Sequence, residues 1–399
     1  MKILIQGINF SPELVGIGKY TGEMVDYLVY QGHEVTVVTA PPYYPLWEIG
    51  EGYSGKRYLK ETNGSLTVIR CPLWVPKRVT GIRRFIHLLS FAITAFPVMV
   101  GQAFRKPDAI ITIAPAITSA PNAIIAGWLS GAPGWLHIQD FEVDAAMNLG
   151  VVGNPKGLSR FVLGIERIIF RQFTRVSSIS FAMVKKLEKK GVAEERCVLF
   201  PNWIDTEVIF PLGHSPMRIE LGYTEDEILV LYSGSMGLKQ GLEVLVQSAK
   251  KLIDQPKIKF LLCGAGPVKA ELENSARDLP NVRFLPLQPY EKLNALLNCA
   301  DVQVLPQKEE ASDLMMPSKL LGMMASGKAI SAGCLPGSEL FKVVDQVGIA
   351  VAPDDVDALV AAIEKYAENA ELRTLAGIQS RKYVCEQYSQ QAVLKNFEK

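Results

Sequence analysis

The stretch Ile228-Leu-Val-Leu-Tyr-Ser-Gly-Ser-Met-Gly-Leu-Lys-Gln-Gly241 joins a short apolar run to a glycine-containing loop that carries one lysine. Apolar runs of this length, bounded by turn residues, are typical of buried parallel strands, and helical sequence follows from about Leu242. Glycines let the backbone approach a ligand closely, and a helix N-terminus presents free N–H groups and the positive end of its dipole. With Lys239 as a mobile cation, the stretch predicts a corner that binds phosphate or diphosphate.

Strand-like and helical segments alternate on both sides of this corner. We expect strands at residues 2–7, 34–39, 66–71, 109–113, 134–138 and 197–200, and again at 228–232, 259–263, 282–285, 301–305, 328–331 and 348–351. Strands separated by helices indicate right-handed βαβ units and parallel sheets. The chain has 399 residues, and this length favours two domains. The sequence therefore predicts an α/β protein with two tandem Rossmann-like, doubly wound domains, whose binding edges face a central cleft.

Charge and cysteine usage bear on the compartment and the partners. Residues 1–200 carry 22 Lys and Arg against 15 Asp and Glu, whereas residues 201–399 carry 20 against 26. The basic first half could face an anionic partner or membrane, although a chance imbalance on two solvated surfaces is also compatible with these counts. The six cysteines are scattered without a Cys-x-x-Cys pair, and the chain begins directly with a strand. Both features predict a cytoplasmic protein.

One apolar segment, residues 85–104, is long enough to span a bilayer. Basic residues flank it on both sides: Lys77, Arg78, Arg83, Arg84, Arg105 and Lys106. It contains polar residues and Pro97, and it lies within the alternating strand and helix pattern. Three interpretations stay open: a spanning helix, a soluble core helix, and a core helix whose basic edge contacts an anionic membrane surface. The last is favoured, and it predicts peripheral association with the inner face of the cell membrane.

In the first half, the loop after the first strand contains Glu13, Gly16 and Gly18. The two glycines would let the backbone approach a ligand before a helix begins near Lys19, and Glu13 would lie near the cleft. The spacing of the glycines does not fit Gly-x-Gly-x-x-Gly, so a dinucleotide fingerprint is excluded. A glycine-containing connector without a ligand is the alternative.

Two further candidates, His137 and Asp140, follow the strand expected at residues 134–138. The carboxyl ends of parallel strands form the functional edge of such a sheet, so these side chains could bind an acceptor hydroxyl or act as a general base. A histidine among apolar residues is also compatible with a core position.

Two more segments would lie at the binding edge of the second domain. Gly264 and Gly266 make a tight turn after the strand at residues 259–263, and Ser318 begins a helix that leaves free N–H groups for a diphosphate or ribose. Lys319 in the first helical turn opposes the helix dipole, which predicts a role such as binding the donor phosphate; a solvated lysine is the alternative. The four histidines are dispersed, and neither a metal motif nor a nucleic-acid motif is present.

These motifs together resemble the retaining glycosyltransferases of family 4, which have the GT-B fold. The resemblance covers essentially the whole chain and is found in the following runs: Phe10-Ser-Pro-Glu13, Pro201-Asn-Trp-Ile-Asp205, Gly234 to Gly241, Gly264-Ala-Gly-Pro267 and Ala325-Ser-Gly-Lys-Ala-Ile330. The runs Tyr20-Thr-Gly-Glu-Met24, Thr39-Ala-Pro-Pro-Tyr-Tyr-Pro45, His137-Ile-Gln-Asp140 and Pro317-Ser-Lys319 are similar to the fucosyltransferase-like members associated with colanic acid.

The resemblance implies an acceptor-binding domain at residues 1–203, a donor-binding domain at residues 204–380, and a C-terminal helix, residues 381–399, that crosses back. It implies transfer of a sugar, fucose in the similar members, from a nucleotide diphosphate to a lipid-linked saccharide, without metal or cofactor. Lys239, Lys319, Asp140 and His137 would be catalytic, and Gly234, Ser235, Gly237, Gly264, Gly266 and Ser318 would bind the donor. Both GDP and UDP donors stay open.

This chain departs from the family pattern at the acidic pair of the donor motif. Leu314 and Gly322 occupy the positions of the two glutamates, so Glu310 or Asp313 would contact the donor sugar instead. Ser235 stands where the family has an arginine. Two other functions stay open. A GT-B sugar-nucleotide epimerase also binds a nucleotide sugar between two such domains, although it should need carboxylates beside the sugar, and the missing acidic pair favours a non-catalytic nucleotide-sugar-binding subunit. A nicotinamide dehydrogenase is the most distant alternative.

Overall fold

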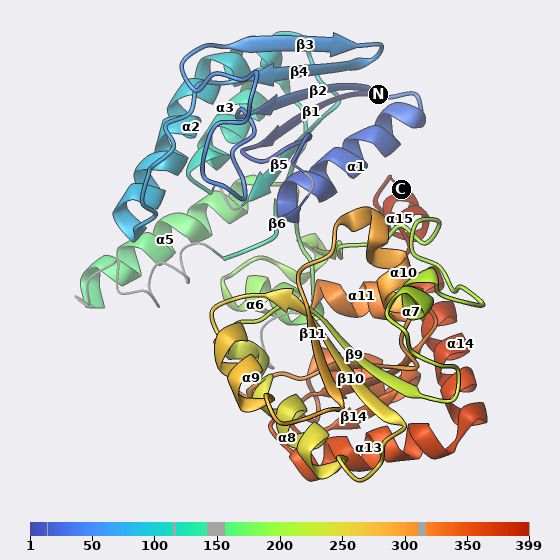
Figure 1. Cartoon of the computed structure of the whole chain (residues 1–399). Coiled ribbons are helices and arrows are strands. Elements are labelled where there is room, and N and C mark those ends of the chain that lie inside the picture. The colour runs from blue at the N-terminus through green and yellow to red at the C-terminus, as the bar shows by residue number, and fades with distance from the viewer. Residues whose placement is uncertain (14, 115–116, 142–155, 310–316, 399) are drawn as a thin grey trace. The chain divides into compact units, whose positions relative to one another are not determined.

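The computed structural model describes residues 1–13, 15–114, 117–141, 156–309 and 317–398 of the chain (Figure 1). These residues form two compact units, Met1–Pro201 together with Glu398, and Asn202–Phe397. Each unit has a mostly parallel sheet with helices packed against it, as the alternation of apolar strands and helical segments predicts.

The first unit is built on an eight-stranded sheet in the order β3-β4-β2-β1-β5-β6-β7-β8. Its strands are β1 (Lys2–Gly7), β2 (Glu34–Thr39), β3 (Leu59–Asn63), β4 (Leu66–Arg70), β5 (Ala109–Ala114), β6 (Gly134–Ile138), β7 (Arg175–Ser178) and β8 (Cys197–Leu199). All neighbouring pairs are parallel except the edge hairpin of β3 and β4. The helices are α1 (Gly16–Tyr30), α2 (Gly81–Ala103), α3 (Ala120–Ser130), α5 (Lys156–Gln172) and α6 (Phe181–Lys189), with 3₁₀ turns η1 (Ile117–Ser119) and η2 (Glu194–Arg196).

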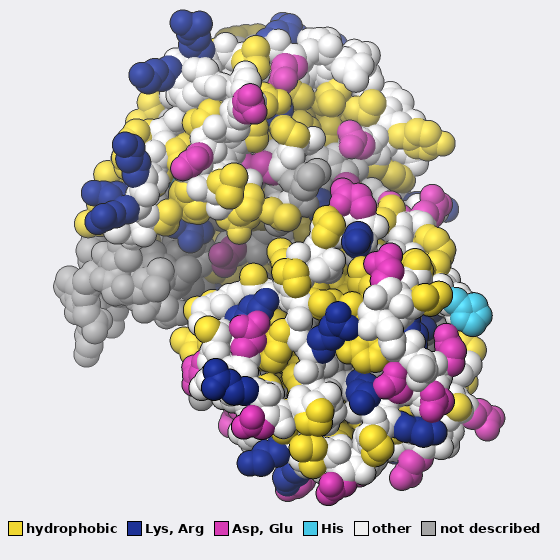
Figure 2. Space-filling model, in the orientation of Figure 1, with side chains coloured by type: hydrophobic (Ala, Val, Ile, Leu, Met, Phe, Trp, Pro, Cys, Tyr) yellow, Lys and Arg dark blue, Asp and Glu magenta, His cyan; other side chains and the backbone are white. Residues whose placement is uncertain are grey.

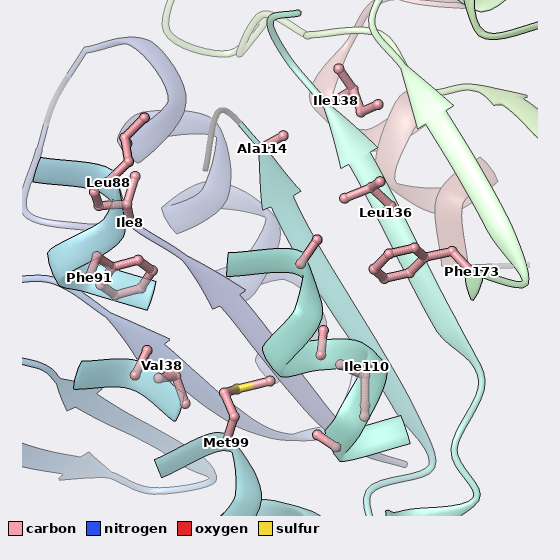
Figure 3. Close-up of a cluster of buried hydrophobic side chains, with 14 of the residues drawn as sticks. Ile8, Val38, Leu88, Phe91, Met99, Ile110, Ala114, Leu136, Ile138 and Phe173 are labelled. Atoms are coloured by element: carbon pink, nitrogen blue, oxygen red, sulfur yellow. The ribbon is translucent and has the colours of Figure 1, made fainter. Parts of the chain in front are cut away.

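The core of the first unit lies between this sheet and helices α2 and α3. Ile8 just after β1, Ile110 and Ala114 of β5, and Leu136 and Ile138 of β6 point to one face of the sheet (Figure 3). Side chains of α2 cover this face: Leu88, Phe91 and Met99. Each Å² of apolar surface that is removed from water stabilises the fold by about 25 cal/mol. The packing of these side chains therefore fixes the sheet, and with it the positions of the loops at its carboxyl edge.

The second unit is built on a six-stranded, entirely parallel sheet in the order β11-β10-β9-β12-β13-β14. Its strands are β9 (Ile228–Ser235), β10 (Ile258–Ala265), β11 (Val282–Leu285), β12 (Val302–Leu305), β13 (Ala329–Gly333) and β14 (Ile349–Val351). The helices are α7 (Pro216–Glu220), α8 (Glu243–Lys251), α9 (Lys269–Ser275), α10 (Leu293–Asn298), α11 (Ser318–Ala325), α12 (Glu339–Val347), α13 (Val356–Glu368), α14 (Ala370–Gln387) and α15 (Gln390–Glu398), with 3₁₀ turns η3 (Leu238–Gln240) and η4 (Tyr290–Lys292).

All twelve predicted strands are present, and the structure adds two that were missed. Strand β3 is an exposed edge strand rich in polar residues, so it has no apolar run to mark it. Strand β7 has the sequence Arg-Val-Ser-Ser, so it also lacks an apolar run. Its two serines can be buried because hydrogen bonds satisfy their hydroxyls. The Oγ atom of Ser178 donates to the carbonyl of Ile138 at 2.7 Å, for example.

Candidate functional site

The carboxyl ends of β9 and β10 meet at two paired glycines. Gly234 lies opposite Gly264 in the parallel register. A Cβ atom on Gly264 would lie 1.9 Å from the carbonyl oxygen of Gly234, and Gly234 has a φ of 141°. Neither position accepts a side chain without a backbone shift, so the strand ends form a bare backbone surface at the functional edge of the sheet.

The two glycine-containing turns are interlocked just beyond this pair. The N–H of Met236 donates to the carbonyl of Ala265 at 2.8 Å, and the N–H of Val268 donates to the carbonyl of Met236 at 3.2 Å. A Cβ atom on Gly266 would lie 2.2 Å from the Met236 oxygen. The turn after β10 therefore fits closely around the loop after β9, and the predicted position of Gly264 and Gly266 beside Gly234 is correct.

Lys319 extends from the first turn of α11 over the end of β9. Its Nζ atom donates to the hydroxyl of Tyr232 at 2.6 Å, and this hydroxyl in turn donates to the carbonyl of Ser235 at 2.5 Å. The ammonium also lies 4.4 Å from the centroid of the Tyr232 ring, a cation–π distance. A Cβ atom on Gly234 would lie 2.9 Å from Nζ. The lysine thus fills the space that the missing side chain leaves.

Burial changes the protonation chemistry of this pair. It lowers the pKa of Lys319 to about 8, because the ammonium is partly removed from water. Burial also raises the pKa of Tyr232 well above its usual range, so the phenol stays neutral. An anion placed beside Lys319 would offset the lost hydration of its ammonium, which makes this position suited to a phosphate.

Lys239 follows β9 in the sequence and differs from Lys319 in its surroundings. It belongs to the turn η3, is exposed, and has no ion pair within the described part of the chain. The side-chain oxygen of Gln240 accepts from the N–H of Gly237 at 3.0 Å and so shapes the turn. The N–H of Lys308, after β12, donates to the carbonyl of Lys239 at 3.2 Å. The sequence did not predict this contact, because no residue near Lys308 in the sequence indicates that it would meet a loop 69 positions earlier.

Two of the remaining donor-side candidates lie within the described residues, and two do not. Ser235 is exposed at the end of β9, and Ser318 is exposed as the first residue of α11. Glu310 and Asp313 lie outside the described residues, so their predicted contact with a donor sugar stays a prediction.

Glu13, in the first unit, was expected near a ligand, but the structure places it in the interior. Its Oε1 atom accepts from the N–H groups of Tyr43 and Tyr44 at 3.0 and 2.9 Å, and its Oε2 atom accepts from the amide of Asn9 at 2.9 Å. Burial raises its pKa, although these hydrogen bonds oppose the shift. The buried carboxylate holds the loop around Tyr43 through these bonds, so the structure assigns Glu13 a role in positioning this loop.

The two glycines beside it have separate structural causes. Gly16 begins α1 with a φ of 61°, a left-handed conformation that favours glycine. A Cβ atom on Gly18 would lie 2.6 Å from Oε2 of Glu13. Gly18 is therefore required by the buried carboxylate, which explains the residue without any ligand.

The structure also places His137 differently from the predicted general-base role. Its side chain is buried and its Nδ1 atom lies 2.9 Å from the hydroxyl of Ser177, which also accepts from the indole of Trp135 at 2.7 Å. Burial lowers the pKa of His137 to about 3. A histidine this buried and this weakly basic is a core residue, so the general-base role is not supported. Asp140, two residues beyond β6, is exposed and stays available as a ligand for an acceptor hydroxyl.

Comparison with known proteins places these features in a family. Residues 15–203 match the model for the "Glycosyl transferase 4-like domain", and residues 227–369 match the model for "Glycosyl transferases group 1". The Escherichia coli strain K12 protein named "Putative colanic acid biosynthesis glycosyl transferase WcaI" is 43% identical over 375 residues, which is 92% of each chain. The chain belongs to this glycosyltransferase family. The predicted enzyme class is therefore confirmed.

Solved structures confirm the fold of this glycosyltransferase. The sucrose-phosphate synthase of Thermosynechococcus elongatus has a TM-score of 0.71 at 17% identity, covering 100% of this chain and 97% of that one. A glycosyltransferase from Rickettsia africae has a TM-score of 0.69 at 14% identity, with coverage of 100% and 97%. Neighbours of this kind have the GT-B fold, as predicted.

Among the described residues of the glycosyltransferase, no group of three or more His, Cys, Asp and Glu side chains could hold a metal ion. The chemical groups that the second unit brings together are a lysine, backbone glycines and the start of a helix: Lys319, Gly234, Gly264 and Ser318. Such a set can bind and stabilise a diphosphate.

Proposed function

We propose that this glycosyltransferase transfers a sugar, with retention, from a nucleotide diphosphate to a saccharide in polysaccharide biosynthesis. The observation that carries the proposal is the position of the Lys319 ammonium over Gly234, at the carboxyl end of β9. The name of the 43% identical relative, which refers to colanic acid biosynthesis, supports the link to an exopolysaccharide of this kind.

The site suits a reaction in which the leaving group gains negative charge. As the bond between the sugar and the diphosphate breaks, the oxygen that leaves becomes more anionic, and Lys319, Lys239 and oriented N–H groups would stabilise it. In a retaining transfer of this type, the leaving phosphate can accept the proton of the acceptor hydroxyl. This account requires neither a covalent nucleophile nor a metal ion.

Two groups on the acceptor side support a division of labour between the units. Asp140 is exposed beyond β6 and could orient an acceptor hydroxyl, whereas Glu13 holds the loop around Tyr43 through hydrogen bonds to its N–H groups. Both lie beyond the carboxyl ends of strands, where ligands bind in open α/β sheets. We therefore assign acceptor binding to the first unit.

Helix α2 supports a lipid-linked acceptor and contact with an anionic membrane. It is the one helix among the described residues with the length and apolar composition to cross a bilayer, yet one face of it packs into the core. Large apolar side chains remain exposed along the other face: Ile82, Phe85, Ile86, Leu89, Ile93 and Phe96. Figure 2 shows hydrophobic side chains mixed with Lys and Arg along the edge where α2 lies. An apolar face between basic ends suits the interface of an anionic bilayer.

A donor panel tests the function directly. Purified full-length protein would be mixed with GDP-fucose, GDP-mannose, UDP-glucose or UDP-galactose and a membrane extract that holds lipid-linked saccharides. We expect transfer from a GDP-sugar, fucose first, that persists in EDTA. Transfer only from a UDP-sugar would overturn the proposed donor and keep the reaction. Release of a free epimer without acceptor would instead identify an epimerase, and tight donor binding without transfer would identify a non-catalytic subunit.

A further inference from the structure

A second concave site lies at the other edge of the C-terminal sheet. The donor corner is at the carboxyl ends of the strands, whereas this pocket is beside Asp301 and Ala329, at the amino ends of β12 and β13. Its volume is about 580 Å³. This is within the range of small-molecule pockets, roughly 300–1,000 Å³.

One face of α14 forms a wall of the pocket. The lining residues of this helix follow a spacing of three and four, as expected for a single helical face: Ala370, Arg373, Thr374, Gly377, Ile378, Arg381 and Lys382. Gly377 brings the helix against the turn before β13, because a Cβ atom there would lie 2.1 Å from the carbonyl oxygen of Gly327. Ala370, Thr374 and Gly377 have short side chains or none, so a cavity remains in front of this helical face, and cationic side chains line it.

The charge of the lining is strongly positive. Lys328 and three cations of α14 lie in it, and none of the four has an ion pair within the described ranges. The acidic lining residue, Asp301, is already used: its Oδ2 atom accepts from Nη1 of Arg218 and from the N–H of Leu229, both at 2.8 Å. No other acidic side chain lines the pocket among the described residues.

The two arginines are held in place by the backbone. Arg381 donates to the carbonyls of Ile209, Ala325 and Thr206 at 2.8–2.9 Å. Arg373 donates to the carbonyls that end α13. Backbone carbonyls fix these guanidinium groups without neutralising them, so their positive charge remains in the pocket.

Lys328 is the least satisfied cation of the set. It is half-buried, and it makes no hydrogen bond within the described part of the chain. Burial lowers its pKa, against the attraction of Asp301. A partly desolvated ammonium that makes no hydrogen bond is unfavourable, and an anionic ligand would supply the missing hydrogen-bond acceptor.

We propose that this pocket binds a phosphate-bearing organic molecule of nucleotide or sugar-phosphate size, at a site distinct from the donor corner. The phosphate would lie between Lys328 and Lys382, and the carbon part would contact Ile378 and Pro211. The inference depends on this pocket alone and stands whether or not the proposed donor is correct.

The test uses calorimetric titration of the full chain, with the donor corner weakened by Lys239→Ala and Lys319→Met. The probes are inorganic phosphate, a hexose 1-phosphate and a nucleoside monophosphate. We expect one remaining site that binds an organic phosphate more tightly than inorganic phosphate. If no site remains, the proposal is wrong. If inorganic phosphate binds as tightly as both organic probes, the assignment to an organic ligand is wrong.

A charge pair at Ile378 locates the site. Ile378 is exposed, so the substitutions Ile378→Glu and Ile378→Lys should both leave the fold intact. The first should weaken binding about threefold or more and the second should strengthen it, as expected for screened charges near an anion. Leu375→Glu and Leu375→Lys are the matched controls, because Leu375 is equally a surface residue of α14 but does not line the pocket. Equal effects at the two positions would overturn the location.

Discussion

The Lys319 ammonium lies 2.6 Å from the hydroxyl of Tyr232, and this hydroxyl donates to the carbonyl of Ser235. A side chain from α11 is thereby fixed to the end of β9, in the space above Gly234. A lysine in the first turn of a helix opposes the dipole. The contact with Tyr232 provides the reason for its presence, because it aims the cation at the functional edge of the sheet.

Removal of this cation should reduce transfer. We expect Lys319→Ala to lower kcat by about 10- to 100-fold, because a charge-assisted hydrogen bond to the leaving diphosphate contributes roughly 1.5–3 kcal/mol. Initial rates with saturating donor measure the effect. Lys250→Ala, at an exposed lysine of α8, is the control. A wild-type kcat in Lys319→Ala would remove this residue from the mechanism.

The donor affinity should depend on pH through the same lysine. Its pKa is about 8, so the ammonium is present below pH 8 and is lost above it. Binding of GDP should therefore weaken as the pH rises from 7 to 9. Lys319→Arg should flatten this decrease, since a guanidinium stays charged throughout the range. Titrations at several pH values measure both, and an unchanged pH dependence in Lys319→Arg would contradict the assignment.

Tyr232→Phe tests the positioning of the lysine. The buried ring is kept, whereas the hydroxyl that accepts from Lys319 is removed. We expect a fall in kcat of about 3- to 10-fold, as for a loss of roughly 1 kcal/mol when the lysine is less well positioned. A purely structural role would change only the melting temperature. The positioning role also predicts that activity declines at a lower pH than in the wild type, because the hydroxyl stabilises the ammonium.

Gly18→Ala should destabilise the first unit. The new Cβ atom would lie 2.6 Å from the buried carboxylate of Glu13, whose partners prevent it from moving away. We expect a loss of about 1–3 kcal/mol in the free energy of unfolding, measured by chemical denaturation. Gly164→Ala, at an exposed position of α5 where no atom of the described residues would lie within 4 Å of the new Cβ, should instead be neutral or stabilising. Equal stabilities of the two variants would contradict the interior position of Glu13.

The exposed face of α2 makes a prediction for membranes. Ile93 is 64% exposed, so Ile93→Glu should leave the fold intact and reduce binding to vesicles that contain anionic lipid. We expect at least a fivefold loss, because the change removes an apolar contact and adds repulsion. Co-sedimentation measures it, with Leu375→Glu of α14 as the control. If the wild-type protein does not sediment with these vesicles, the membrane contact is wrong.

Much of the second unit could be predicted from local sequence. The apolar runs of β9 and β10 end at glycines, and strand–turn–helix order alone places these ends at one edge. The unfavourable position of Lys319 also indicated a special role before its partner was known. Tyr232 could not be identified, because an aromatic residue in a buried strand is usually only a core residue.

The first unit shows what local sequence does not contain. The partners of Glu13 include the N–H groups of Tyr43 and Tyr44, some 30 positions away. The sequence around a loop carboxylate does not indicate whether the carboxylate faces a ligand or hydrogen-bond donors inside the protein. Whether His137 is a core residue or a general base likewise depends on its contact with Ser177. This serine lies on β7, one of the two strands that were not predicted.

The hydrogen bonds of Glu13 have a practical consequence for engineering. Residues 41–47 follow the carboxyl end of β2, at the edge of the unit to which we assign acceptor binding, so they are a segment to exchange when a different acceptor is wanted. Its shape, however, is set from the beginning of the chain. A chimera that carries the new loop needs Asn9, Glu13 and Gly18 from the same parent, or a replacement that restores the two donated N–H bonds. Without them the grafted loop would lose its anchor.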